Sequence, residues 1–180
     1  MKKLVLVAVA VLLIGGGAYA GSPYLAASNL KAAAVSGDAD QIEANVDFPA
    51  VRDSLKSQMS AAMMQKLNSD PEMKDNPFAG LGMMMVPAIV DKVVDAYVTP
   101  DGLSALIQGS KPTDAKGSAG STNPNIEYDY EWVNSVRFRV NLTNTQTQQA
   151  GLALVFERRG VVTWKLVKVD LDDSFFENDN

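Results

Sequence analysis

Residues 126–142 read IEYDYEWVNSVRFRVNL, and their pattern is the clearest structural signal in the chain. Large apolar side chains alternate with polar ones on both sides of Asn134-Ser135. A period of two is typical of a strand with one buried face, and two such runs joined by a short polar turn predict an antiparallel hairpin. The apolar positions are Tyr128, Tyr130 and Trp132 before the turn, and Val136, Phe138, Val140 and Leu142 after it.

The next thirty residues repeat this pattern and extend the predicted sheet. A polar turn covers 143–148, a second turn lies around Arg158-Arg159-Gly160, and the apolar positions of the last run change face after Leu166. A change of face within one strand favours a β-bulge or a strand buried on both sides. The apolar positions are Ala150, Leu152, Leu154 and Phe156, then Val162, Trp164 and Leu166, then Val167, Val169 and Leu171.

Residues before 110 have a helical period instead. Val51, Leu55, Met59 and Met63 recur every four residues, which predicts an amphipathic helix starting at the cap Asp47. Two further helices are predicted before it: one from Ser22-Pro23 to a stop at Gly37, and a short one after the cap Asp38, with Gln41 in capping-box position. Two more are predicted after it: one from Val86 with Pro87 in its first turn, and one from Thr99-Pro100-Asp101 to a stop at Gly109.

The order of these elements predicts an α+β fold: about three to four helices packed on one face of a curved antiparallel sheet of three to four strands. The predicted divisions are a helical half at 21–109, a flexible linker at 110–125 that is rich in Gly, Ser, Thr and Pro, a sheet half of the same domain at 126–172, and an acidic tail at 173–180.

The amino terminus predicts export. Lys2-Lys3 precedes an apolar run from Leu4 to Ile14, and Ala18-Tyr19-Ala20 fits a cleavage site, so residues 1–20 read as a signal peptide of a bacterial periplasmic protein. The uncharged stretch continues to Leu30, so an uncleaved anchor over 4–30 in the inner membrane is the alternative. Gly15-Gly16-Gly17 and Pro23 interrupt a helical pattern and favour cleavage.

Composition excludes several classes of function. The 180 residues contain no Cys and no His, which rules out disulfides, thiolate or histidine metal sites, and catalysis by Ser-His-Asp or Cys-His groups. Without residues 1–20 the chain has 14 basic and 21 acidic residues, a net charge of −7 that disfavours nucleic acid as a partner. We therefore predict a protein that is not an enzyme and that needs no cofactor and no metal.

Two sets of residues are candidates for binding. The methionines and aromatic residues line either an ordinary core or an adaptable apolar groove. Thioether ligation of Cu(I) by the methionines is a further alternative, which the absence of His and Cys as partner ligands disfavours. A basic stripe is predicted on the exposed sheet face, where it contacts an anionic group or pairs across the strands with Glu131, Glu157 and Asp129. Its members are Arg137, Arg139, Arg158 and Arg159, of which Arg137 and Arg139 are the candidate surface contacts. The candidate residues of the apolar ligand site are Met63, Met84, Tyr97, Trp132, Phe138 and Trp164.

A third set, Glu127, Asp129 and Glu131, shares one strand face. Paired carboxylates perform acid–base chemistry or bind a hard cation such as Ca²⁺. The alternative, which we favour, is that they are solvated positions on an exposed strand.

Several segments together resemble one bacterial family. They are Ser22-Pro23-Tyr24, residues 36–40, the stretch VDFPAVRDSLK at 46–56, Thr99-Pro100-Asp101-Gly102-Leu103, Phe138-Arg139-Val140, and FERRG at 156–160 followed by Trp164-Lys165-Leu166. This chain resembles the domain of unknown function 2939 family, and the resemblance implies an exported or membrane-anchored envelope protein with no established activity. At the level of fold, the arrangement is similar to the cystatin-like cone of the nuclear transport factor 2-like and SnoaL-like proteins.

Two functions follow as predictions. The first is an exported, non-catalytic binding module that holds an apolar or lipid-like ligand between sheet and helices. The second is a structural or interaction factor with an envelope protein as partner, tethered to the inner membrane by its amino-terminal segment and holding no small molecule.

Overall fold

The computed structural model describes residues 2–69, 79–108, 126–145 and 150–171, with helices first in the chain and strands last. This order confirms the predicted α+β class. The helices are α1 (Lys2–Ser36), α2 (Ala39–Asn45), α3 (Phe48–Ser69), α5 (Ala79–Tyr97) and α6 (Pro100–Ile107); the strands are β1 (Ile126–Asn134), β2 (Arg137–Asn144), β3 (Ala150–Arg158) and β4 (Trp164–Leu171).

The four strands form one antiparallel sheet in the order β1-β2-β3-β4, which is the predicted meander. Its register aligns Trp132 with Phe138, Phe138 with Phe156, and Phe156 with Leu166. The register shifts between Val155 and Phe156, so the predicted bulge is confirmed where β3 pairs with β4. The large apolar side chains of all four strands therefore lie in one row across the inner face.

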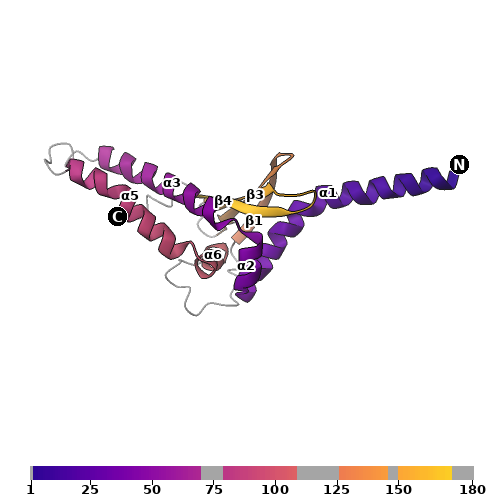
Figure 1. Ribbon diagram of the computed structural model, residues 1–180, viewed down its shortest axis with the longest axis horizontal. Coiled ribbons are helices and arrows are strands. Elements are labelled where there is room, and N and C mark those ends of the chain that lie inside the picture. The colour runs from indigo at the N-terminus through magenta and orange to yellow at the C-terminus, as the bar shows by residue number, and fades with distance from the viewer. Residues whose placement is uncertain (1, 70–78, 109–125, 146–149, 172–180) are drawn as a thin grey trace.

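Helix α1 is longer than the sequence predicts. It runs without interruption through Gly15-Gly16-Gly17 and Pro23, so the expectations that these residues break the helix and that a new helix starts at Ser22-Pro23 are wrong. Figure 1 shows one bent helix whose first half leads away from the body and whose second half lies against it. Pro23, which lies inside α1, accounts for the bend because proline lacks one helical hydrogen bond. Packing of the second half of α1 against the body outweighs the weak helix propensity of the glycines and Pro23.

The predicted helix ends are confirmed between α1 and α3 and before α6. Gly37 has φ of 67°, the left-handed conformation of a helix stop. Asp38 accepts from the Gln41 backbone N–H and side chain, both at 3.0 Å, and Asp47 accepts from the Ala50 N–H at 3.3 Å. Thr99 accepts from the Gly102 N–H at 3.1 Å in front of Pro100.

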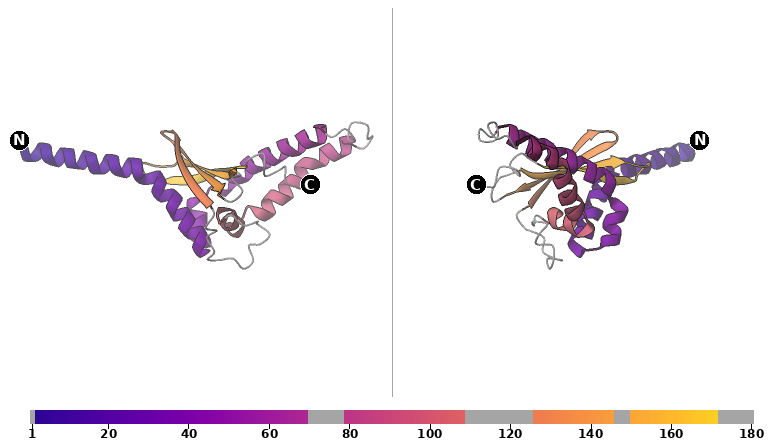
Figure 2. Two further views of the ribbon diagram at one scale, coloured as in Figure 1. Left: turned by 180° about the vertical axis from the view of Figure 1, so that it is seen from behind. Right: turned by 60° about the vertical axis from the view of Figure 1, so that its left-hand side comes forward.

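Helices α3 and α5 pack side by side and form a two-helix arm that leads away from the sheet, opposite the first half of α1 (Figure 2). Pro87 lies well inside α5 rather than in a first turn, so that prediction is wrong. The helix starts seven residues earlier, at Ala79, and Pro87 is exposed, where water can reach the carbonyl group that its ring leaves without a partner.

The core lies between the inner sheet face and the helices, and both halves of the chain contribute to it. Leu30 from α1, Ile42 from α2, and Leu103 and Ile107 from α6 are fully buried with the sheet residues. The predicted linker at 110–125 and the acidic tail at 173–180 lie outside the described residues. The main sheet-side members of the core are Phe138, Val140, Leu154, Phe156, Trp164, Leu166 and Val169.

Candidate functional site

Five aromatic side chains meet at the end of the sheet where the β1–β2 and β3–β4 turns lie. Ring centroids are 4.8 Å apart for Tyr24 and Phe138, 5.5 Å for Tyr24 and Tyr130, and 5.6 Å for Trp132 with both Phe138 and Trp164. We call these residues (Tyr24, Tyr130, Trp132, Phe138 and Trp164) the aromatic cluster. Most of the pairs are edge-to-face, an arrangement that adds to the stability gained from burial alone.

The chain positions this cluster by strand alternation. Tyr130 and Trp132 are two residues apart on β1 and therefore share a face, and the register brings Phe138 opposite Trp132. Phe138 and Trp164 are buried, whereas Tyr24, Tyr130 and Trp132 are partly exposed. The cluster thus has a dry interior and an accessible rim.

Helix α1 is held to this end of the sheet by polar contacts. The Trp164 indole N–H donates to the Ser22 hydroxyl at 2.8 Å, a buried hydrogen bond, and the Ser22 hydroxyl donates to the Tyr19 carbonyl at 2.9 Å. The Arg158 guanidinium lies 3.8 Å from the ring centroid of Tyr19 and 4.4 Å from that of Trp164. These four residues join the helix to the sheet at the point where the helix leaves the body.

The structure brings together half of the predicted ligand residues. Trp132, Phe138 and Trp164 belong to the aromatic cluster, but Met63 and Met84 lie on the arm, exposed, and Tyr97 ends α5. The predicted apolar face of α3 is buried only in its first half, at Val51 and Leu55, with Met59 packed against the core, and Met63 farther along the helix is exposed. Ligand binding by the six residues stays a prediction.

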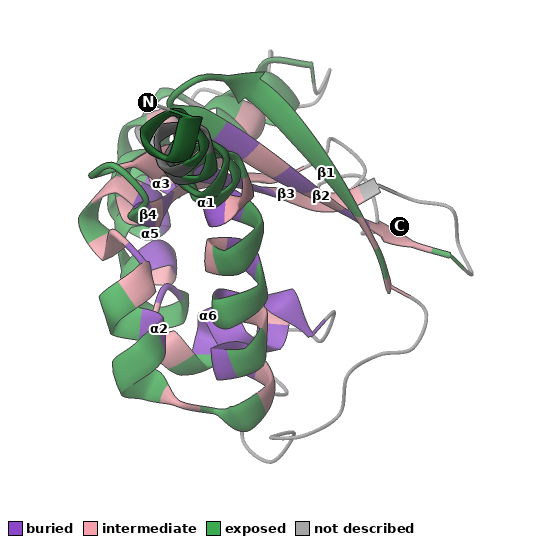
Figure 3. Cartoon of the chain, turned by 90° about the vertical axis from the view of Figure 1, so that its right-hand side faces the viewer, coloured by how far each residue is buried: buried purple, intermediate pink, exposed green. Residues whose placement is uncertain are grey.

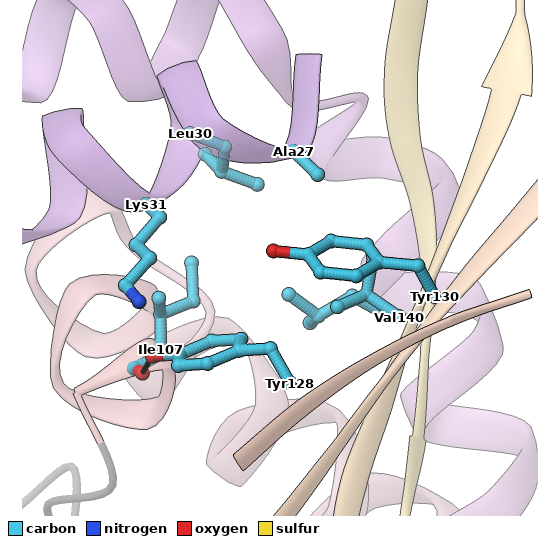
Figure 4. Close-up of a pocket in the computed structure, with 8 residues that line it drawn as sticks. Ala27, Leu30, Lys31, Ile107, Tyr128, Tyr130 and Val140 are labelled. Carbon is cyan, nitrogen blue, oxygen red and sulfur yellow. Dashed lines mark hydrogen bonds between the residues drawn. The ribbon is translucent and has the colours of Figure 1, made fainter. Parts of the chain in front are cut away.

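A small cavity lies between α1, α6 and the sheet (Figure 4). Its space is about 10 Å³, which is close to the room of one water molecule and far below that of a lipid. Figure 4 shows the Tyr130 ring and the Lys31 side chain on its rim, with Lys31 Nζ 3.7 Å from the centroid of the Tyr128 ring. The lining residues are Ala27, Leu30, Lys31, Ile107, Tyr128, Tyr130, Val140 and Leu154.

Tyr128, which lines this cavity, joins β1 to α6. Its hydroxyl donates to the Ile107 carbonyl at 3.2 Å. Burial raises the pKa of Tyr128 above its usual value, with a smaller contribution from Tyr130. The phenol is therefore neutral at ordinary pH and acts as a structural donor between β1 and α6.

Arg137 and Arg139 are paired with carboxylates, the second of the two roles that the sequence analysis considers for them. Arg137 Nε lies 3.6 Å from Glu157 Oε2 across the sheet, and Arg139 Nη2 lies 3.2 Å from Asp170 Oδ2. Exposed pairs of this kind contribute about 0–1 kcal/mol each. Their charges are partly neutralised, so the two arginines are a weak basis for an anion site.

Glu127, Asp129 and Glu131 lie exposed along β1, as solvated strand positions do. The Asn141 side-chain amide donates to Asp129 at 3.5 Å. Among the described residues, no three carboxylate or other metal-ligating side chains gather in a group that would hold a metal ion.

The sequence analysis missed three residues of this end of the molecule: Tyr19, Tyr24 and Arg158. Tyr19 was assigned to the signal peptide, Tyr24 to a family motif, and Arg158 to the basic stripe and a turn, without their contacts to one another or to the aromatic cluster. The residue types were the signal that could have identified these contacts, because arginine stacks on aromatic rings and tyrosine beside an apolar segment favours an interface.

The first half of α1 is apolar and exposed on several sides. Leu4, Leu6, Leu12, Leu13 and Ile14 are all exposed. Figure 3, seen from the amino-terminal side, shows this part of the helix as exposed. Within the residues searched, which are the described ones, no helix is both long enough and apolar enough to cross a membrane.

Comparison with known proteins identifies the family of this chain. The family model described as "Protein of unknown function (DUF2939)" matches residues 12–106, which is more than half of the chain. No curated protein and no solved structure matches, so the likeness to the cystatin-like cone has no support from a structural neighbour. The matched range begins inside the apolar part of α1 and ends within α6. The chain therefore belongs to the DUF2939 family of proteins of unknown function.

Proposed function

We propose that this protein is an exported bacterial envelope protein without catalytic activity, which associates with a lipid bilayer through residues 2–20 and offers the rest of the chain to a protein partner in the periplasm. One observation carries the proposal: the first half of α1 projects from the body, and the side chains of Leu4, Val5, Leu6, Leu12, Leu13 and Ile14 are exposed to solvent. Soluble monomers expose only small apolar patches, and larger ones mark contact with a membrane or a protein.

The continuity of α1 favours retention of residues 1–20 over their cleavage. The Ala20–Gly21 bond lies inside the helix, and both of its flanks are held: Tyr19 by the Arg158 guanidinium, Ser22 by Trp164. Proteases bind extended substrate, so cleavage of the folded protein would require the helix to open at this point. Cleavage after Ala20 before the chain folds would leave Ser22 in the product, together with its hydrogen bond to Trp164.

An interaction role agrees better with the geometry than a carrier role does. The cavity between helices and sheet has room for about one water molecule, so a lipid-like ligand would require the sheet and α1 to separate. The arm, by contrast, presents Met84, Met85 and Ile89 to solvent, and flexible methionine side chains adapt to different partners.

The test is the mass and location of the protein made from its own gene start. We expect the full-length mass in the membrane fraction and resistance to high salt, because apolar contact is insensitive to ionic screening. Residues 21–180 placed behind an unrelated cleavable signal provide the control and should be recovered in the soluble periplasmic fraction. A soluble periplasmic product with the mass of residues 21–180 from the full gene would refute the membrane association.

A further inference from the structure

The two hairpin turns at the aromatic end of the sheet lie next to each other. The Arg158 backbone N–H donates to the Val136 carbonyl at 2.9 Å, and Arg158 Nε donates to the Ser135 carbonyl at 3.2 Å. The same side chain donates from Nη1 to the Val161 carbonyl. One arginine thus ties the β1–β2 turn to the β3–β4 turn and makes a single surface of them.

This surface lies beside the place where α1 leaves the body. The Arg158 guanidinium that joins the turns also stacks on Tyr19, which lies near the end of the exposed half of the helix. Figure 3 looks along that half of α1 and shows exposed sheet ends beside it.

The turns expose apolar side chains where turns ordinarily carry polar ones. Turn positions favour Gly, Asn, Asp, Ser and Pro, which solvate well or adopt special backbone conformations. Here Val161 is 77% exposed, and Val133, Val136 and Val162 are about half exposed. Two partly exposed rings lie at the same end of the sheet: Tyr19, which stacks on Arg158, and Trp132, which precedes Val133 in the chain. None of the four valines belongs to the core or packs against it, so the fold alone does not require them to be apolar.

We propose that these residues form a collar that enters the interfacial layer of a lipid bilayer around the base of α1. The collar consists of Tyr19, Trp132, Val133, Val136, Val161 and Val162. The inference deepens the proposed function, on which it rests for the presence of a bilayer.

Lipid is the occupant that the observations favour. The collar is continuous with the apolar half of α1, and tyrosine and tryptophan prefer the level of the lipid head groups, where one end of the ring is wet. The charged residues nearby are mixed, since Arg137 and Arg159 pair with Glu157, and Arg159 also with Asp47. Binding by the collar therefore depends on apolar insertion, and anionic lipid is not required.

The absence of cysteine makes the test clean, because a single introduced cysteine takes an environment-sensitive fluorophore at one place only. Three full-length variants are labelled: Val161→Cys on the collar, Leu12→Cys on the exposed half of α1, and Met84→Cys on the arm. All three positions are exposed, so folding is retained. Each is mixed with phosphatidylcholine vesicles, with and without phosphatidylglycerol.

The expected result is a rise in fluorescence of about twofold or more at Val161→Cys and at Leu12→Cys, with a shift to shorter wavelength, and no change at Met84→Cys. The rise should be similar in both kinds of vesicle. A response at Leu12→Cys without one at Val161→Cys overturns the collar and leaves the membrane association intact. No response at either position overturns both, and an equal response at Met84→Cys shows nonspecific adsorption and overturns the collar.

A paired substitution measures the contribution of the turn. Val161→Asp with Val162→Asp should weaken the partitioning of the full chain into the same vesicles about tenfold, because two valines lose apolar contact and two charges must enter the interface. The matched control, Met84→Asp with Met85→Asp, changes two adjacent exposed apolar residues on the arm and should leave partitioning unchanged. Equal partitioning of the two double variants would contradict the collar.

Discussion

Gly102 shows how one residue fixes the joint between α5 and α6. A Cβ at this position would lie 1.9 Å from the Tyr97 carbonyl oxygen, so any larger residue forces the backbone of the joint to move. We expect Gly102→Ala to lower the free energy of unfolding by about 3 kcal/mol, at the upper end of overpacking costs.

The control for this prediction is Gly82→Ala inside α5, where no atom lies within 4 Å of the added Cβ. Alanine is the better helix former, so this variant should gain up to about 1 kcal/mol. Denaturant unfolding of both variants measures the difference. If Gly102→Ala is as stable as Gly82→Ala, the close approach to Tyr97 is wrong.

Tyr128 predicts a loss of stability at high pH. Its pKa is raised by burial, so between the ordinary value of 10.0 and the higher folded value the folded state holds a proton that the unfolded state has released. The free energy of unfolding therefore falls as pH rises through this window, and the stability is fully present below pH 10.

Tyr128→Phe removes this titration and should flatten part of the decline, at the cost of about 1 kcal/mol at neutral pH for the lost hydrogen bond to Ile107. The pKa of Lys56 is also raised, mainly by its hydrogen bond to Asp95, and its effect likewise declines at alkaline pH. The difference between wild type and Tyr128→Phe isolates the tyrosine. Parallel curves for the two proteins above pH 10 would refute its role.

At the scale of elements, α1 combines two environments in one helix. Leu30 is buried and Leu12 is exposed. Leu30→Ala should cost about 2–5 kcal/mol, the range for buried leucine, whereas Leu12→Ala should change stability by less than about 0.5 kcal/mol. Thermal or denaturant unfolding in mild detergent compares the two. Equal effects would mean that the second half of the helix is not part of the core.

Gln58 joins the arm to the sheet. Its side-chain amide donates to the Val169 carbonyl at 2.8 Å and accepts from the Leu171 N–H at 3.1 Å, so it takes the place of a neighbouring strand beside β4. Gln58→Ala should cost about 1–3 kcal/mol and speed amide exchange at Leu171, because two backbone groups lose their partner. Gln65→Ala, an exposed position farther along α3, is the control and should leave that exchange rate unchanged.

The elements differ in how far the sequence predicts them. Alternation around Trp132 and Phe138 was enough for the strands and their antiparallel order, and caps such as Asp38 and Thr99 marked helix starts, because both signals act between near neighbours. The continuity of α1 through Pro23 was not predictable from local propensity, since the packing of Leu30 and the contact of Ser22 with Trp164 determine it. For the same reason, the apolar stripe that ends at Met63 predicted a helix with one apolar face but not which element that face packs against.

At the scale of the whole molecule, the apolar half of α1 and the two-helix arm extend from opposite ends of one core. If the collar rests on a bilayer, the arm is directed away from it and is accessible to a partner. Removing residues 1–20 should leave a folded protein that does not bind vesicles, and removing residues 1–36 should abolish folding, because Leu30, Ala33 and Ala34 are buried in the core. Circular dichroism of both truncated chains checks this, and a folded chain starting at Gly37 would contradict it.

The hydrogen bond between Ser22 and Trp164 joins residues 142 positions apart. Because a ribosome releases the chain from its amino-terminal end, α1 is made before the strands and contacts β4 only after the last strand has been made. Contacts between distant positions also form slowly. Until the strands have been made, the second half of α1 stays without them, and its apolar face is open to chaperones and to non-native contacts. Membrane contact by the first half of the helix would shorten the search, since it would hold one member of the pair in place while β4 arrives.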